Sequence, residues 1–452
     1  MIDLADNMDR ENELRHLQQA RRLLFKGGII LTLDKQIGDF ASADVLVEDG
    51  IIRDIASEIA SNSDDTAVID AKDRIVLPGF VDTHSHSYQG LLRGLLPNGV
   101  VMPDYDRDIQ KNITAHYTPE DAYAGVYITA LGMLDMGTTT MVDISQVAHS
   151  PEHIDANIQA LRDSAMRSVF TYSRGTGPQA RYPQDIERLL PTYFSSDDQL
   201  LTPALAVSTD PTIFKVARDA GVRAVLHVRL NSEPLIFLGR AGLLREGDEF
   251  IHCAHLNAEA WKLIKDTGGT TSHSPPLEMA MGHGMPSIQD ALDAGLKPSL
   301  SCDHCATVGQ DMFGIMRITF ALQRLSAQQR QRDGDSSAPN LLTCREVLEF
   351  ATINGARCAN LDRKIGTLTP GKDADMLMLR ADDIGIAPLN NAVAAVVNLM
   401  NPSHVDAVFV KGAVRKWRGG LVGVDKNRVL SMVRRSRDDV LRRAGFSIDL
   451  MN

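Results

Sequence analysis

The stretch IVLPGFVDTHSH, residues 75–86, decides both the fold and the chemistry that we expect of this chain. A continuous apolar run broken only by a Pro-Gly turn is typical of a strand buried in a parallel sheet. Side chains two residues apart point to the same face of a strand, so His84 and His86 can both reach one ion at its end. A single histidine would more often be a satisfied core residue. The His-X-His pair therefore predicts two metal ligands.

Apolar strands and amphipathic helices alternate from residue 75 onward, which is typical of a parallel sheet. We assign eight strands, at 75–84, 138–145, 167–173, 204–210, 223–228, 250–255, 269–275 and 297–303. Helices with capping residues are predicted between them, at 119–137, 151–165, 211–221, 257–268 and 287–295. Such repeats close naturally into a (β/α)8 TIM barrel with catalytic groups at the carboxyl ends of its strands. A doubly wound open sheet is the alternative within the α/β class.

The segments that flank the predicted barrel, 22–74 and 366–425, consist of β-branched runs broken by Gly and Asp turns. Neither segment has enough strands to bury a core alone, so together they predict one small discontinuous β-sandwich domain. The barrel domain then occupies 75–365, and an amphipathic basic helix is expected within 426–452.

Composition narrows the class of protein. The 452 residues carry a net charge of −11, which argues against nucleic-acid or anionic-membrane partners because both select basic surfaces. Five cysteines form no disulfide framework, and the lone pair Cys302 and Cys305 lacks the second pair that a zinc knuckle needs. The N-terminus lacks a signal peptide's apolar segment, and no stretch reaches the ~20 apolar residues of a membrane span. We expect a cytoplasmic enzyme.

Histidines gather where the predicted strands end. Seven of thirteen lie at or just after strand ends: His84, His86, His227, His252, His273, His283 and His304. His227, which ends the fifth strand, is the natural third metal ligand, and Asp303, which ends the eighth, is the natural fourth. Imidazoles with one carboxylate suit Zn²⁺, with iron or manganese as alternatives.

A bound divalent ion would lower the pKa of its water to about 7, which provides a hydroxide nucleophile at neutral pH. Asp303 could take a proton from that water. His252, which ends the sixth strand, could hold or polarise the water or the substrate, or orient the ligands.

Four motifs in order along the chain resemble the amidohydrolase superfamily, nearest to its cytosine, adenosine-thioether and triazine deaminases and chlorohydrolases. They are VLPGFVDTHSH (76–86), FIHCAHL (250–256), SCD (301–303) and IGTLTPGKDADMLML (365–379), and the similarity runs from about residue 22 to 425. This resemblance implies a distorted barrel with a flanking β-sandwich, and a homodimer or larger homo-oligomer.

The resemblance also implies a metal centre held by His84, His86, His227 and Asp303, with His252 as catalytic partner. Binuclear relatives carry a carboxylated Lys on the fourth strand, and the segment ALAVSTD (204–210) has none. One metal ion is therefore expected.

The chain departs from this clade in its acidic residues. Deaminases of the clade usually carry a Glu three residues after the fifth-strand His, where this chain has Leu230. Glu233 follows six residues after that His, and Glu278 stands where a substrate-contacting Asn is expected. Our hypothesis is that Glu278 transfers a proton or reads a donor on the substrate. The alternative is that Glu278 pairs with a nearby Arg or His and holds its loop.

Substrate contacts are expected from Tyr88 and Gln89, just past the metal pair, and from His283 and His304. The segments 95–109 and 284–288 are predicted as rim loops without the aromatic residues of a purine-stacking pocket.

The function that we predict is hydrolysis of a C–N bond (amide, amidine or deaminase-like) in a small molecule by the metal-bound hydroxide. The alternatives are a lyase, decarboxylase or isomerase that uses the same metal as a Lewis acid, and an inactive metal-binding homologue.

Overall fold

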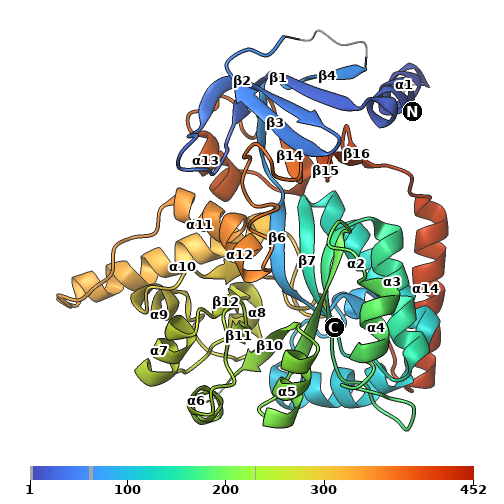
Figure 1. Ribbon diagram of the computed structural model, residues 1–452, viewed down its shortest axis with the longest axis vertical. Coiled ribbons are helices and arrows are strands. Elements are labelled where there is room, and N and C mark those ends of the chain that lie inside the picture. Colours follow the sequence, from blue (N-terminus) through green and yellow to red (C-terminus); the bar gives the residue numbers. More distant parts are fainter. Residues whose placement is uncertain (1–3, 61–64, 230, 452) are drawn as a thin grey trace.

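The computed structural model describes residues 4–60, 65–229 and 231–451, and its centre is an eight-stranded parallel barrel (Figure 1). The barrel strands are β6 (Phe80–Ser85), β7 (Thr138–Ser145), β8 (Arg167–Tyr172), β9 (Leu201–Val207), β10 (Arg223–Val228), β11 (Glu249–His252), β12 (Thr270–His273) and β13 (Ser299–Leu300). Each strand pairs in parallel with its neighbours in sequence, and all eight predicted strands contribute. The expected α/β barrel is confirmed.

The first and last strands close the barrel through the residues that follow β13. Asp303 N–H donates to His84 O at 2.8 Å, and its carbonyl accepts from His86 N at 2.8 Å. Inside the barrel, the Thr83 hydroxyl lies 2.7 Å from Ser272 Oγ and 2.9 Å from Ser299 Oγ. The short strands β12 and β13 are thus joined to β6 by buried hydroxyl groups as well as by the backbone.

Helices cover the outside of the barrel, and the five predicted helices form as α2, α3, α5, α7 and α9. The barrel helices are α2 (Pro119–Asp135), α3 (Pro151–Ser164), α4 (Ile186–Tyr193), α5 (Pro211–Asp219), α6 (Glu233–Arg240), α7 (Ala258–Asp266), α8 (Pro275–Ala280), α9 (Ile288–Asp293), α10 (Met312–Arg332), α11 (Cys344–Phe350) and α12 (Ile353–Cys358). Short helical segments are η1 (Ser87–Leu92), η2 (Val101–Asn112), η3 (Ile113–His116), α13 (Ala392–Ala394), η4 (Ala395–Leu399) and η5 (Pro402–His404).

A second sheet lies at one end of the barrel and joins the two ends of the chain (Figure 1). Its strands are β1 (Arg22–Ile30), β2 (Phe40–Glu48), β3 (Ile51–Ala56), β4 (Thr66–Asp70), β5 (Arg74–Pro78), β14 (Met376–Arg380), β15 (Val405–Val410), β16 (Ala413–Trp417) and β17 (Gly420–Leu421). The central pairing is between β5 and β14, which run antiparallel, and this sheet has its own apolar core. The N- and C-terminal segments therefore build one flanking sheet together, as expected.

One prediction needs correction, because the run 75–84 is not a single barrel strand. Residues up to Pro78 belong to the flanking sheet, and the barrel strand begins at Phe80. Gly79 lies at the crossing, where a Cβ atom would come within 2.0 Å of Thr139 Oγ1. Only glycine fits this approach, which explains the Pro-Gly pair in the middle of the run.

A buried arginine joins the two domains. Arg167 begins β8, and its Nε lies 2.8 Å from Asp375 Oδ2 while its Nη2 lies 2.7 Å from Asp373 Oδ2. Both carboxylates belong to the GKDAD segment just before β14. The acidic pair of that segment thus fixes the flanking sheet against the barrel.

The remaining helices lie on the outside of the molecule. The helix α14 (Lys426–Arg443) runs along α2, where Ser436 and Arg443 both contact Asp121 (Figure 1). The helix α1 (Leu4–Gln19) contacts β16 of the flanking sheet. In the described residues, no helix combines the length and the apolar character that crossing a membrane requires.

Replacing Arg167 with Ala should lower the free energy of unfolding by about 3–5 kcal/mol, because the buried carboxylates lose their counterion. Denaturant titration followed by circular dichroism measures the change. The control is Arg240→Ala, since the exposed Arg240–Glu259 pair contributes at most about 1 kcal/mol. Equal losses in the two variants would contradict a special role of Arg167 at the domain boundary.

Candidate active site

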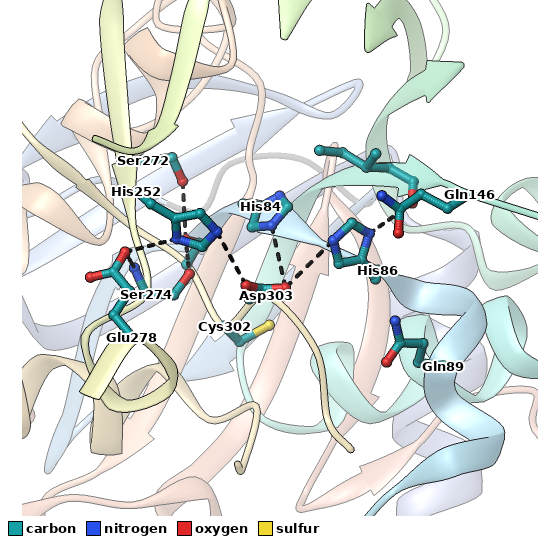
Figure 2. Close-up of polar contacts among 12 residues, drawn as sticks. His84, His86, Gln89, Gln146, His252, Ser272, Ser274, Glu278, Cys302 and Asp303 are labelled. Carbon is teal, nitrogen blue, oxygen red and sulfur yellow. Dashed lines mark hydrogen bonds and ion pairs between the residues drawn. The ribbon is translucent and has the colours of Figure 1, made fainter. Parts of the chain in front are cut away.

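Three of the predicted histidine ligands and Asp303 converge at the carboxyl end of the barrel. His84 and His86 come from the end of β6, and His227 comes from β10. His84 Nε2 lies 3.3 Å from Asp303 Oδ1, and His86 Nε2 lies 3.5 Å from the same oxygen (Figure 2). The rings of His84 and His227 are 4.8 Å apart between centroids. The four side chains therefore gather around His84, whose ligand atoms form one group with His86 and Asp303 and a second group with His227 and His252.

The chemistry of this cluster fits a divalent ion. Neither ring nitrogen of His84 has a hydrogen-bond partner among the described residues, although the side chain is fully buried. Burial lowers the pKa of His86 to about 3 and that of His227 well below its usual value, so both imidazoles stay neutral. Burial would raise the pKa of Asp303, but the adjacent His84 lowers it well below its usual value. Burial would lower the pKa of His84 as well, but Asp303 raises it, so an ion that binds here would displace a proton from His84. The deprotonated imidazoles and the ionised carboxylate are a donor set that suits Zn²⁺.

Surrounding groups fix the orientation of these side chains. The His86 ring presents Nδ1 to the carbonyl oxygen of Ile144 at 3.2 Å, which turns Nε2 toward Asp303. Asp82 accepts one hydrogen bond from His84 N at 3.0 Å and another from Cys302 N at 3.1 Å. The Asp82 carboxylate thus connects the strand of the histidine pair to the loop that carries Asp303.

Two of the site residues have left-handed backbone conformations. His252 has φ of 67° and Asp303 has φ of 61°. Residues other than glycine adopt this region at a cost in free energy, and such residues cluster at functional sites. Both side chains are aimed at the histidine cluster from these turns (Figure 2).

His252 lies between Asp303 and Glu278 (Figure 2). Its Nδ1 lies 3.0 Å from Glu278 Oε1, and its Nε2 lies 3.5 Å from Asp303 Oδ2. The Glu278 carboxylate also accepts a hydrogen bond from Ser274 N at 2.9 Å. Burial lowers the pKa of His252 to about 3 and raises the pKa of Glu278. Glu278 therefore touches a histidine of the site.

A cavity of about 590 Å³ opens above this cluster. The predicted residues on its wall are His86, His227, His252, His283, Asp303 and His304. Glu278 is not on the wall, and neither are Tyr88 and Gln89, which are fully buried behind it. The prediction of direct substrate contact by Tyr88 and Gln89 is therefore not supported by where they lie.

Tyr88 and Gln89 instead hold other polar side chains in place. Gln89 Nε2 donates to the Tyr105 hydroxyl at 2.6 Å, and the Tyr88 hydroxyl donates to Gln146 Oε1 at 3.1 Å. Gln110 completes the network with Nε2 at 3.0 Å from the Tyr105 hydroxyl. Tyr105, Gln110 and Gln146 do line the cavity. Tyr105 belongs to the predicted rim segment 95–109, whereas no sequence pattern identifies Gln110 and Gln146.

The expectation of a pocket without aromatic residues is wrong. Tyr105 belongs to the segment 95–109 and stacks on the ring of His304, with centroids 4.5 Å apart and planes at 10°. Tyr182 also lines the cavity. Part of the predicted rim loop is moreover helical, because η2 begins at Val101. The cavity therefore offers aromatic surface to a flat substrate.

Residues 75–415 match the sequence pattern of the amidohydrolase family, which is most of the chain. The chain belongs to this family. The match begins in β5 and ends in β16, so it includes the complete barrel and both halves of the central pairing in the flanking sheet. The protein is an amidohydrolase-type hydrolase.

Curated relatives match this amidohydrolase over almost its whole length. A 5-methylthioadenosine/S-adenosylhomocysteine deaminase of Acetivibrio thermocellus is 26% identical, over 93% of this chain and 100% of its own. A 5′-deoxyadenosine deaminase of Methanosarcina mazei is 24% identical, over 93% and 99%.

Solved structures of low sequence identity share the fold of this amidohydrolase. An adenosine deaminase of Xanthomonas campestris with bound zinc gives a TM-score of 0.81 at 20% identity, covering 93% of this chain and 98% of that one. A variant of the atrazine chlorohydrolase of Arthrobacter aurescens, complexed with zinc and atraton, gives a TM-score of 0.82 at 21% identity, covering 92% and 100%.

Among the described residues directly after the fifth barrel strand, no glutamate lines the cavity. Leu230 lies outside the described residues. Glu233 is exposed in the first turn of α6 and does not line the cavity. Of the two candidates that the sequence offered, only Glu278 contacts the site.

Acid should destabilise this amidohydrolase partly through His273, whose pKa burial lowers to about 4. Below pH ~6.5 the unfolded chain binds a proton at this residue that the folded chain does not bind until about pH 4. Stability is therefore lost as the pH falls through this window. The variant His273→Gln should lose up to about 1.4 kcal/mol less per pH unit there than the wild type.

Urea unfolding at several pH values between 4 and 6.5 measures this difference. The exposed His116 gives the control, because His116→Gln removes an imidazole without opening a buried site. Parallel pH dependence in wild type and His273→Gln would contradict a buried neutral His273.

Proposed function

We propose that this protein is a mononuclear, zinc-dependent aminohydrolase that displaces an amino group from an amidine-type carbon of a small heterocycle. The observation that carries the proposal is the clustering around His84, with His86 and Asp303 in one possible ligand group and His227 and His252 in a second. Glu278 lies against His252. Two further findings support it: the curated relatives are named as deaminases, and the solved neighbours contain zinc. Iron and manganese are the alternative ions for the same donor set.

A single ion is favoured by what the fourth barrel strand offers. The strand β9 has the sequence LTPALAV and carries no lysine that could bridge two ions as a carbamate. The four proposed ligands would hold one ion, and water or substrate would bind it as a fifth ligand. The chemistry that an ion supplies when bound there is activation of a water, whose pKa falls to about 7.

The two oxygens of Asp303 face different partners. Oδ1 lies closest to His84 and His86, whereas Oδ2 lies 3.5 Å from His252 Nε2. Because Asp303 stays ionised, its Oδ2 can stabilise a positive charge on the His252 imidazole. One carboxylate thus serves both as a ligand and as the counterion of the group that moves protons.

His252 is placed to accept and return a proton at Nε2. The Nδ1–H of the neutral ring donates to Glu278, which leaves the Nε2 lone pair facing the cluster and the cavity. In that tautomer, His252 can take a proton from the attacking water and deliver it to the departing nitrogen. His252 therefore fills the role that a carboxylate after the fifth strand fills in relatives.

Glu278 acts through His252 in this proposal. The carboxylate fixes the tautomer and stabilises the imidazolium that forms when His252 is protonated. Its second oxygen, Oε2, has no hydrogen-bond partner among the described residues, so Glu278 can itself hold the shared proton. The alternative role of loop support is compatible with its hydrogen bond from Ser274 but does not explain the contact with His252.

The cavity wall suits a flat, nitrogen-rich ring. Tyr105 stacked on His304 offers an aromatic face, and the side-chain amides of Gln110 and Gln146 offer hydrogen-bond donors and acceptors. Aromatic faces and a few fixed polar groups are the usual lining of small-molecule sites. We also place the enzyme in the cytoplasm as a homodimer or larger oligomer, from the family resemblance and its five free cysteines.

The purified protein should contain about one equivalent of zinc, and His86→Ala should lower that content severalfold, because the ion loses one of four ligands. Mass spectrometry of the acid-digested protein for zinc, iron and manganese gives the measurement. His149→Gln is the control, since His149 is a buried histidine that hydrogen-bonds the Thr114 carbonyl outside the cluster. Two equivalents of metal would contradict the mononuclear site, and full occupancy in His86→Ala would contradict the ligand assignment.

Replacing Glu278 with Gln should keep the metal but lower kcat by about 10²- to 10⁴-fold, because the proton-handling imidazole loses its anionic partner. Ammonia release from a panel that includes 5-methylthioadenosine and 5′-deoxyadenosine gives the rates. The pH profile of kcat should change as well, which a merely structural role would not cause. Glu233→Gln is the control, and unchanged turnover of Glu278→Gln at full metal content would show that Glu278 is dispensable.

A further inference from the structure

Two arginines stand on the cavity wall without a partner. Arg174 follows β8 and Arg229 follows β10, and both line the cavity that holds the histidine cluster. Both side chains are exposed, and neither makes an ion pair with any described residue. Many of the other arginines of the chain do make such pairs, as Arg188 does with Asp155 and Asp185. These two cations are thus left facing the space that the substrate occupies.

The negative charges on the same wall are already compensated. Asp106 pairs with Lys111 at 2.6 Å, and Asp303 faces the histidines. Glu278 lies against His252 behind the wall and does not line the cavity. Once an ion occupies the cluster, the positive charges of the cavity therefore exceed the negative ones.

Arg174 and Arg229 reach the same cavity from the ends of two strands that are separated by one other strand. Only β9 separates β8 from β10 in the barrel, and neighbouring strands are about 4.8 Å apart, so the two strand ends are roughly 10 Å apart. An arginine side chain spans more than half of that gap, and each guanidinium presents a fork of donors that matches a carboxylate.

Arg229 also lies near the reacting groups. It follows His227 by two residues. Burial is the main cause of the low pKa of His227, His252 and His283, and the Arg229 charge acts in the same direction on all three. An anion bound by Arg229 would therefore lie in the same cavity as the histidine cluster.

We infer that the substrate of this enzyme carries a carboxylate, and that Arg174 and Arg229 bind it at the mouth of the cavity. The inference rests on the proposed aminohydrolase function and specifies its substrate class: acidic amino-substituted compounds rather than neutral ones. The contact with Arg229 would also place the amidine-type carbon over the histidine cluster, because the carboxylate anchors one end of the molecule.

The test compares binding of matched probes that differ in a carboxylate: S-adenosylhomocysteine against 5-methylthioadenosine, and 4-carboxybenzamidine against benzamidine. Calorimetric titration of the metal-loaded protein is the readout, so the result does not depend on turnover. The carboxylate member of a pair should bind at least tenfold more tightly. Arg229→Gln should reduce that preference by about 10- to 100-fold, the loss expected for a charge-assisted pair, and Arg174→Gln should reduce it as well.

Affinity for the neutral probe and metal content should stay unchanged in both variants. Arg181→Gln is the matched control, because Arg181 is exposed in the same loop after β8 but does not line the cavity. Equal binding of both probes of each pair, binding of neither, or an equal loss for both probes in Arg229→Gln would overturn the inference. Absence of metal or of ammonia release would overturn the proposed function instead, since the arginine test measures selectivity of binding alone.

Discussion

Asp303 has two roles: its backbone closes the barrel, and its side chain joins the histidine cluster. Its N–H and its carbonyl group pair with His84 and His86 across the seam between the last and the first strand. The side chains of the same three residues face one another at 3.3–3.5 Å. Since β13 has only two residues, these bonds and the buried hydroxyls around Thr83 carry much of the closure. The same three residues therefore close the barrel and form this part of the site.

Three ionisable side chains follow one another from the histidine cluster into the protein interior, in the order Asp303, His252 and Glu278. Asp303 stays ionised beside the histidines, His252 stays neutral, and burial raises the pKa of Glu278. This order places the neutral imidazole of His252 between two carboxyl groups. In the proposed function, His252 is the proton carrier at the cavity and Glu278 holds it from behind.

Much of the architecture was predictable, because strand and helix periodicities and helix caps are local properties of sequence. The histidine cluster was predictable for a related reason: the carboxyl ends of parallel strands meet, so histidines at strand ends converge. The crossing at Gly79 was not, since an apolar run has the same pattern in either sheet. Nor was the contact between Glu278 and His252, because it joins the end of β11 to the first turn of α8, which only the folded barrel brings together. Tyr105 and Gln110 reach the cavity from the helical segment η2, whose direction has no local signature, and Gln146 reaches it from the residue after β7.

The left-handed conformations of His252 and Asp303 restrict sequence change at these two positions independently of their chemistry. Asparagine, aspartate, histidine and glycine tolerate such a backbone, whereas β-branched residues do not. A descendant of this barrel that had lost its metal would thus still favour the same few residue types there. In distant relatives, an acidic residue or a histidine at these turns can therefore be retained because of the backbone conformation alone. Retention of His84, His86 and His227, which are free of that constraint, is the better sign that catalysis has been inherited.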